Sequence, residues 1–262
     1  MRNEGEAIKL PQISEREMFA ILLSQDPERN QEEPAIASGI AVQMEHMELD
    51  LMPLSIKARI RDISGKLQTS NAVLVGGGIG NLAAWLLDLW CGDPANPPNE
   101  PPSRPDSLRI IEPGGKFGII INRLISRHSA DNWTQVITKQ WQEVVAETVS
   151  QTAITPTLPK SANQSLLPMP LDLVIIDVPE SERPSTAATA FEVLSPGGIM
   201  IVQEPEVPTS DVGVAELGSE LTPEQQKVES FNSWISFVKQ VNESHSLSFV
   251  ELDGGTLVVF RK

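Results

Sequence analysis

The chain of 262 residues carries 35 acidic and 20 basic side chains, and its formal net charge of −15 disfavours nucleic acid as a partner because a polyanion is repelled. A hydrophobic content of 40% suits a globular chain of one α/β domain with additions, or of two small domains. The single cysteine, Cys91, excludes an internal disulfide framework and a cysteine metal cluster. The first residues lack a signal-peptide pattern and no run has the roughly 18 apolar residues of a membrane span, so we expect a cytoplasmic protein with no membrane partner.

The first 54 residues are predicted to form an N-terminal helical cap or arm, and residues 55–262 a larger domain. Helical patterns cover 14–25, which opens with Ser-x-x-Glu in the manner of a capping box, and 53–67. Between them lies the acidic segment 43–52, which places Met44, Met47 and His46 near one another. We interpret it as packing of the cap, with the lining of a substrate pocket as the alternative.

Short runs rich in Val, Ile and Leu then alternate with segments of helical length. The predicted strands are 72–75, 108–112, 134–138, 171–177 and 197–204, and the predicted helices between them are 80–90, 115–128, 142–151 and 186–194. Proline-bearing loops are expected at 91–107, 155–170 and 203–211. A long amphipathic helix at 224–244 precedes two antiparallel strands, 246–253 and 256–262. This order predicts an α/β fold: a doubly wound, mostly parallel seven-stranded sheet with a C-terminal antiparallel hairpin and an N-terminal helical cap.

A glycine-rich turn, VGGGIG at 75–80, joins the first predicted strand to a helix. Its glycines fit G-x-G-x-G, whereas in a dinucleotide fingerprint the third glycine would fall on Asn81. No Lys-Ser or Lys-Thr follows, so a Walker-A phosphate loop is excluded. The positive N-terminus of the helix suits a carboxylate, such as that of S-adenosyl-L-methionine (SAM). A purely structural turn is the alternative.

Polar residues stand where the other predicted strands end. Glu112 ends the second strand, where a carboxylate can accept both hydroxyls of a ribose. Gln140 and Trp141 follow the third strand, where they could meet an adenine by hydrogen bonding and stacking, although Trp141 fits equally well as a packed core aromatic. Asp177 ends the fourth strand at the carboxyl edge, where open α/β sheets bind their ligands.

Taken in order, VGGGIG, IIEP, QVITKQWQEVV, LDLVIID, LSPGGIMIVQE and LDGGTLVVFRK resemble the class I SAM-dependent methyltransferases over residues 55–262. More narrowly, they are similar to the catechol-O-methyltransferase-like group, the bacterial O-methyltransferases of family 3. The resemblance implies a homodimer and a set of SAM-binding residues. In this set Gly76, Gly78 and Gly80 bracket the methionine part, Glu112 holds the ribose, Gln140 and Trp141 hold the adenine, and Asp177 completes the site.

The chain also departs from that family. Leu74 stands where the family has an acid, the run from Asp177 to Glu180 replaces Asp-Ala-Asp-Lys, and Gln203-Glu204 replaces Asp-Asn. Asp177, Gln203 and Glu204 still offer oxygen ligands that could hold Mg²⁺ or Ca²⁺, with a metal-free pocket as the alternative. Asp177 and Glu204 are the candidate catalytic bases.

These observations predict a SAM-dependent methyltransferase acting on a small-molecule acceptor, with oxygen as the methylated atom by resemblance. One alternative is a methyltransferase-like protein with a degenerate catalytic site that serves as a binding or regulatory module. An NAD-dependent enzyme is another alternative, which the glycine spacing and the terminal hairpin disfavour.

Overall fold

The computed structural model describes residues 15–24, 32–100, 102–154, 166–209 and 221–262. Its strands are β1 (Asn71–Val75), β2 (Ser107–Ile111), β3 (Thr134–Ile137), β4 (Leu171–Ile176), β5 (Leu194–Gln203), β6 (Ser246–Leu252) and β7 (Gly255–Arg261). Its α-helices are α1 (Glu15–Leu23), α2 (Ala35–His46), α3 (Leu54–Ser64), α4 (Asn81–Cys91), α5 (Gly115–Arg127), α6 (Trp141–Ile154), α7 (Arg183–Val193) and α8 (Pro223–Asn242), and a 3₁₀ turn, η2, spans Glu180–Glu182.

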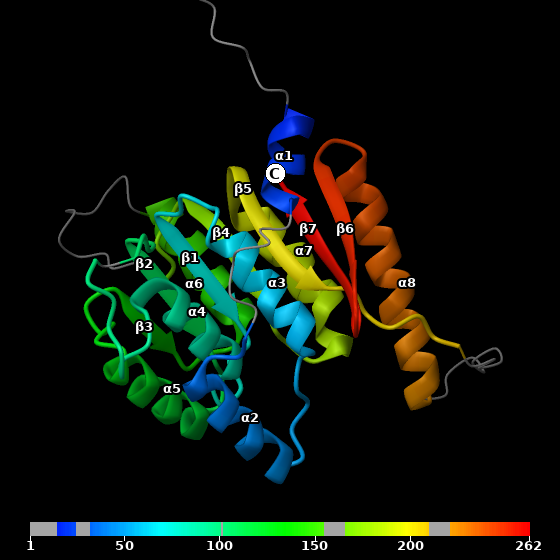
Figure 1. Ribbon diagram of the computed structural model, residues 1–262. Coiled ribbons are helices and arrows are strands. Elements are labelled where there is room, and N and C mark those ends of the chain that lie inside the picture. The colour runs from blue at the N-terminus through cyan, green and yellow to red at the C-terminus, as the bar shows by residue number, and fades with distance from the viewer. Residues whose placement is uncertain (1–14, 25–31, 101, 155–165, 210–220) are drawn as a thin grey trace, which may run out of the picture.

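The seven strands form one sheet in the order β3-β2-β1-β4-β5-β7-β6 (Figure 1). The pairs from β3 to β5 are parallel, whereas β7 lies antiparallel to both β5 and β6. The strand order reverses at β1 and β4, and open α/β sheets bind ligands beyond the carboxyl ends of the strands at such a point. The predicted mostly parallel sheet with its terminal hairpin is confirmed.

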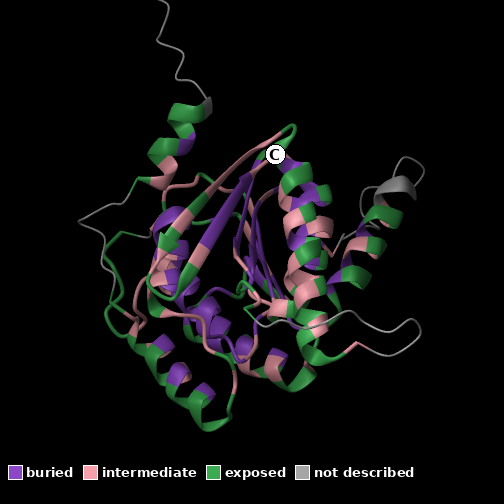
Figure 2. Ribbon diagram, turned by 90° about the vertical axis from the view of Figure 1, so that its right-hand side faces the viewer, coloured by how far each residue is buried: buried purple, intermediate pink, exposed green. Residues whose placement is uncertain are grey.

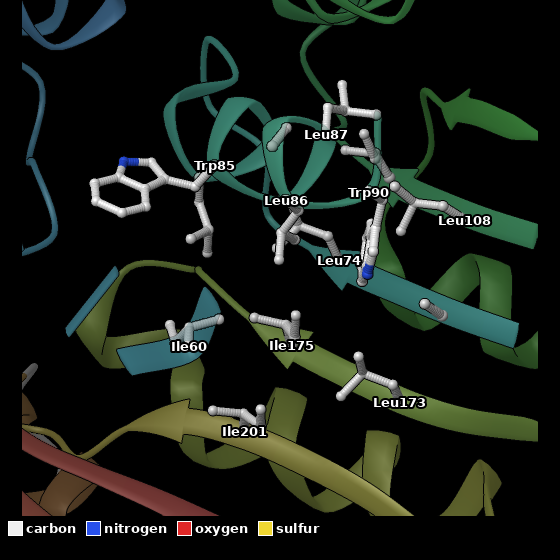
Figure 3. Close-up of a cluster of buried hydrophobic side chains, with 14 of the residues drawn as sticks. Ile60, Leu74, Trp85, Leu86, Leu87, Trp90, Leu108, Leu173, Ile175 and Ile201 are labelled. Atoms are coloured by element: carbon white, nitrogen blue, oxygen red, sulfur yellow. The ribbon is translucent and has the colours of Figure 1, made fainter. Parts of the chain in front are cut away.

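Helices cover both faces of the sheet, so the central strands are buried (Figure 2). On one face α2, α3, α4 and α5 pack over alternate strand residues such as Leu74, Ile175 and Ile201. Figure 3 shows these strand side chains facing the apolar side of α4. On the other face α6, α7 and α8 pack over the intervening residues, such as Val202. Successive strand residues point to opposite faces of the sheet. The position of a residue at a strand end, odd or even along that strand, therefore decides on which face its side chain lies.

The N-terminal helices belong to the same core as the sheet. Predicted helices at 14–25 and 53–67 correspond to α1 and α3, and Ser14 of the predicted capping box lies outside the described residues. Helix α2 was not predicted as an element, and it takes in the start of the acidic segment 43–52. Phe19 of α1 and Ala37 of α2 lie in the same apolar cluster as the buried face of α4. No helix within the described residues is long and apolar enough to span a membrane.

His128 is the C-cap of α5 and is only 6% exposed. Its Nδ1 lies 3.0 Å from the carbonyl oxygen of Leu124, so Nδ1 carries the proton and donates it. Its Nε2 is buried with no hydrogen-bond partner in the part of the chain that the structure describes. Burial lowers the pKa of His128, and this effect outweighs the opposing attraction of Asp88 and Asp93.

The burial of His128 makes the folded protein sensitive to acid. Because the pKa of His128 is lower in the folded than in the unfolded chain, the unfolded chain takes up the proton first. The contribution to stability is complete above about pH 6.5 and is lost as the pH falls below it. Urea unfolding at about pH 7.5 and about pH 5.5 should show a larger loss of unfolding free energy in the wild type than in His128→Leu. Equal losses in the two proteins would contradict this expectation.

Candidate functional site

The turn between β1 and α4 owes its shape to three glycines in backbone conformations that other residues rarely adopt. Gly76, Gly78 and Gly80 have φ angles of 84°, 49° and 98°. Gly80 is the N-cap of α4, and its carbonyl oxygen accepts the first hydrogen bond of the helix, from Ala84. The turn therefore brings the chain directly from the carboxyl edge of the sheet to the N-terminus of a helix, which favours anionic groups.

The surroundings of the glycines show which of them borders open space. A Cβ on Gly76 would lie 2.0 Å from the carbonyl oxygen of Asp177, and one on Gly77 would lie 2.8 Å from a methyl group of Ile121. A Cβ on Gly80 would lie 3.1 Å from Leu124, whereas one on Gly78 would meet nothing within 4 Å. The turn is thus pressed against the end of β4 and against α5, and only at Gly78 does the backbone border open space.

Glu112 follows β2 and lies against the same turn. Its side chain is 7% exposed, with Oε2 accepting the N–H of Gly77 at 3.2 Å and Oε1 accepting the N–H of Gly114 at 2.8 Å. An ionised carboxylate offers about four acceptor positions, so about two remain on Glu112. The structure therefore brings Glu112 together with the glycine turn, with the capacity to accept two further hydroxyl donors.

Asp177 follows β4, and its backbone N–H donates to the carbonyl oxygen of Val75 at 2.7 Å. Burial raises the pKa of Asp177 to about 6, and the negative charge of Glu112 adds to the rise. The positive charges of Arg183 and Lys57 oppose it without cancelling it. Asp177 continues the alternation of Leu173 and Ile175, so it lies on the α2–α5 face of the sheet, as does Glu112.

Lys57 of α3 was not identified from the sequence, yet the structure places it at this site. It is 2% exposed, and its Nζ donates to Glu33 and to Oδ1 of Asn81, each at 2.9 Å. Asn81, the first residue of α4, in turn donates to the carbonyl oxygen of Ala37 at 2.8 Å. This chain of hydrogen bonds ties α2 and α3 to the helix that follows the glycine turn. No sequence signal marked it, because its members lie 24 and 44 residues apart.

Of the three residues predicted as metal ligands, Glu204 is directed away from the other two. Gln203 lies on the α2–α5 face, and its amide lies 3.4 Å from the carbonyl oxygen of Gly254. Glu204 points to the opposite face, where its Oε1 accepts the indole N–H of Trp234 at 3.1 Å. The described ranges contain no group of three or more His, Cys, Asp or Glu side chains placed to hold a metal ion. Asp177, Gln203 and Glu204 do not fit a common metal ion, and Glu204 is turned away from the face that carries Asp177.

The two residues predicted to hold an adenine differ in their placement. Gln140 is exposed at the start of α6. Trp141 is 3% exposed, packs in the core between the sheet and α7, and donates its indole N–H to Thr189 at 2.8 Å. The ring differs from our expectation of a free stacking face because α6 begins at Trp141 and directs the side chain inward. Leu74, where the resembled family has an acid, is fully buried in the core.

The structure confirms a glycine turn before α4, an acid after β2 and a closing antiparallel hairpin, which are features of the resemblance to the class I methyltransferases. No protein-family model and no curated protein matches the chain. Among solved structures it is similar to an O-methyltransferase from Bacillus cereus in complex with S-adenosylhomocysteine (SAH), with 15% identity over 94% of this chain and 96% of that one, and a TM-score of 0.53.

Two further structures give the same result. The O-methyltransferase TomG from Streptomyces achromogenes, solved with SAM and involved in tomaymycin synthesis, is 14% identical, with 93% of each chain covered and a TM-score of 0.53. A methyltransferase from Geobacter sulfurreducens is 9% identical, covering 95% of this chain and all of that one, also with a TM-score of 0.53. At these identities the likeness establishes the fold: the chain has the fold of the class I SAM-dependent methyltransferases.

Proposed function

We propose that this protein is a SAM-dependent methyltransferase that methylates a small-molecule acceptor on oxygen. The observation that carries the proposal is the open space beside Gly78, next to Gly77, whose N–H donates to the buried carboxylate of Glu112. The solved methyltransferases with the same fold, two of which were crystallised with SAM or SAH, support it.

The turn and its neighbours fit the parts of SAM. The glycines at 76, 78 and 80 would border its methionine end, where backbone and the N-terminus of α4 favour a carboxylate. Glu112 would accept the two ribose hydroxyls with its remaining lone pairs, and Gln140 would meet the adenine edge. When bound, SAM supplies an electrophilic methyl group on a sulfonium.

Asp177 is the proposed base. A hydroxyl acceptor must lose a proton as its oxygen is methylated, and a carboxylate with a pKa of about 6 is a better base at neutral pH than an ordinary aspartate. The positive charges of Arg183 and Lys57 favour the ionised form of this carboxyl and so oppose the effect of burial on its pKa. The task left to the chain is alignment of the acceptor with the methyl group, which brings a large rate gain without further chemistry.

The proposal extends to the location, the acceptor class and the assembly of the protein. We infer that the protein acts in the cytoplasm on a small molecule and not on nucleic acid, since the net charge of −15 opposes a polyanion. We also infer a homodimer, by analogy with the resembled family, and an N-terminal cap that ends near residue 54, where α3 begins.

Thermal unfolding with SAH tests the proposal. A ligand at a hundred times its dissociation constant adds about 2.7 kcal/mol to the unfolding free energy, which for this size raises the midpoint by about 5 °C or more. We expect this rise with SAH and none with NAD⁺ at the same concentration. An unchanged midpoint with SAH would refute the proposal of a SAM-dependent methyltransferase. A rise of the midpoint with NAD⁺ alone would favour a dehydrogenase.

A further inference from the structure

Arg183 begins α7 at the carboxyl edge of the sheet, and its guanidinium bridges the ends of β4 and β5. Its Nε donates to the carbonyl oxygen of Val178 at 3.2 Å. Its Nη1 lies 3.4 Å from the carbonyl oxygens of both Gln203 and Glu204. Three backbone oxygens from two neighbouring strand ends therefore converge on one positive charge.

Four carboxylates from separate segments also act on the same guanidinium through their charges. Burial lowers the pKa of Arg183, and the charges of Asp177, Glu180, Glu206 and Asp50 oppose that effect. Asp177 follows β4, Glu180 belongs to η2, Glu206 follows β5, and Asp50 lies between α2 and α3. The carboxylate of Glu180 also accepts the backbone N–H of Glu206, which ties η2 to the segment after β5. We call these segments at the carboxyl edge, beside the proposed base Asp177, the acceptor side of the site, and they are organised around Arg183.

Carbonyl and carboxylate oxygens of this kind are the ligands that Mg²⁺ and Ca²⁺ prefer. We propose that Arg183 is the resident cation of the acceptor side of the site, and that it occupies the backbone oxygens at the ends of β4 and β5 that a divalent metal would need. A metal ion cannot share these oxygens with a guanidinium, since like charges a few ångströms apart repel strongly. The link to methyl transfer rests on the proposed function, whereas the exclusion of a metal follows from the contacts of the guanidinium with the three backbone oxygens.

This assignment makes Arg183 a positioning residue. It fixes the two strand ends through their backbone and faces the carboxyl of Asp177 with a charge that, unlike a metal ion, cannot dissociate. The side chains of Gln203 and Glu204 are then free to make the contacts with Gly254 and Trp234 described above. Methyl transfer at this site would accordingly proceed without a divalent metal.

Titration with Mn²⁺, followed by the electron paramagnetic resonance signal of the free ion, tests the assignment. In Arg183→Met the oxygens lose their cation, so this variant should gain one Mn²⁺ site that is about tenfold or more tighter than any in the wild type. Arg183→Lys keeps the charge and should behave as the wild type does. The matched control is Arg123→Met, which removes an exposed arginine from α5 and corrects for the general attraction of an acidic protein.

If Arg183→Met fails to fold, Mn²⁺ binding by the wild type and by Asp177→Asn still tests the assignment. Equal Mn²⁺ binding by these two proteins supports the assignment. A tight Mn²⁺ site in the wild type that Asp177→Asn abolishes would overturn it, as would an Arg183→Met that folds without gaining affinity. SAH-induced stabilisation, measured in parallel on each variant, reports on the proposed function separately, because it does not depend on the Mn²⁺ result.

Discussion

Gly76→Ala should unfold the domain, whereas Gly78→Ala should leave it folded but unable to bind SAH. At Gly76 the added Cβ would lie 2.0 Å from the carbonyl oxygen of Asp177, and the φ of 84° is strained for any side chain. Gly76 follows β1 and Asp177 follows β4, and both strands are central and buried, so neither can move aside. We therefore expect a loss of more than about 4 kcal/mol in unfolding free energy.

At Gly78 the same methyl group meets nothing within 4 Å, so only the left-handed backbone adds a cost of about 1–2 kcal/mol. The methyl group would instead occupy the space assigned to SAM. Urea unfolding and SAH-induced thermal shifts on the two variants check both parts. A Gly78→Ala protein that binds SAH as tightly as the wild type would show that the open space is not the cofactor site.

Glu112→Ala should weaken SAH binding by about 100-fold, because two hydrogen bonds to a charged group are worth about 3 kcal/mol or more. The same change removes the acceptor for the backbone N–H groups of Gly77 and Gly114, so we also expect a loss of about 2–4 kcal/mol in stability. Calorimetric titration with SAH and urea unfolding measure the two effects.

Glu147→Ala is the matched control, since Glu147 is an exposed glutamate whose surface ion pair with Lys139 contributes little. It should change neither quantity by much. If Glu112→Ala loses stability but keeps its SAH affinity, the carboxylate serves only to hold the turn, and the assignment to the ribose fails.

The elements that carry a strong local signal could be predicted from the sequence. Runs rich in Val, Ile and Leu marked the five parallel strands, and the Gly-Gly turn between residues 246–253 and 256–262 marked the terminal hairpin. The order of strands and helices then identified the fold. Errors at the ends were small: β5 begins at Leu194 instead of residue 197. The glycine turn and Glu112 lie together as expected because both depend on the carboxyl edge of neighbouring parallel strands.

The rest of the site depends on contacts between residues that are distant in the sequence, or on side-chain direction. Lys57 and Arg183 were missed because their partners come from other segments. Helix α2 was missed as an element, and its packing on α4 became visible only in the fold. The separation of Gln203 from Glu204 was within reach of the sequence, since adjacent strand residues face opposite sides. Residue type alone groups them at one site, whereas the pleat of the strand separates them.

Hydrogen exchange of the full chain with and without saturating SAH tests the central claim most directly. The account predicts slower exchange in the peptides that cover 76–81 and 112–116, and no such slowing in Gly78→Ala. Unchanged exchange in these peptides would contradict it. Protection confined to the peptides around Ala188 of α7 and in α8, which line a cavity of about 620 Å³, would also contradict it.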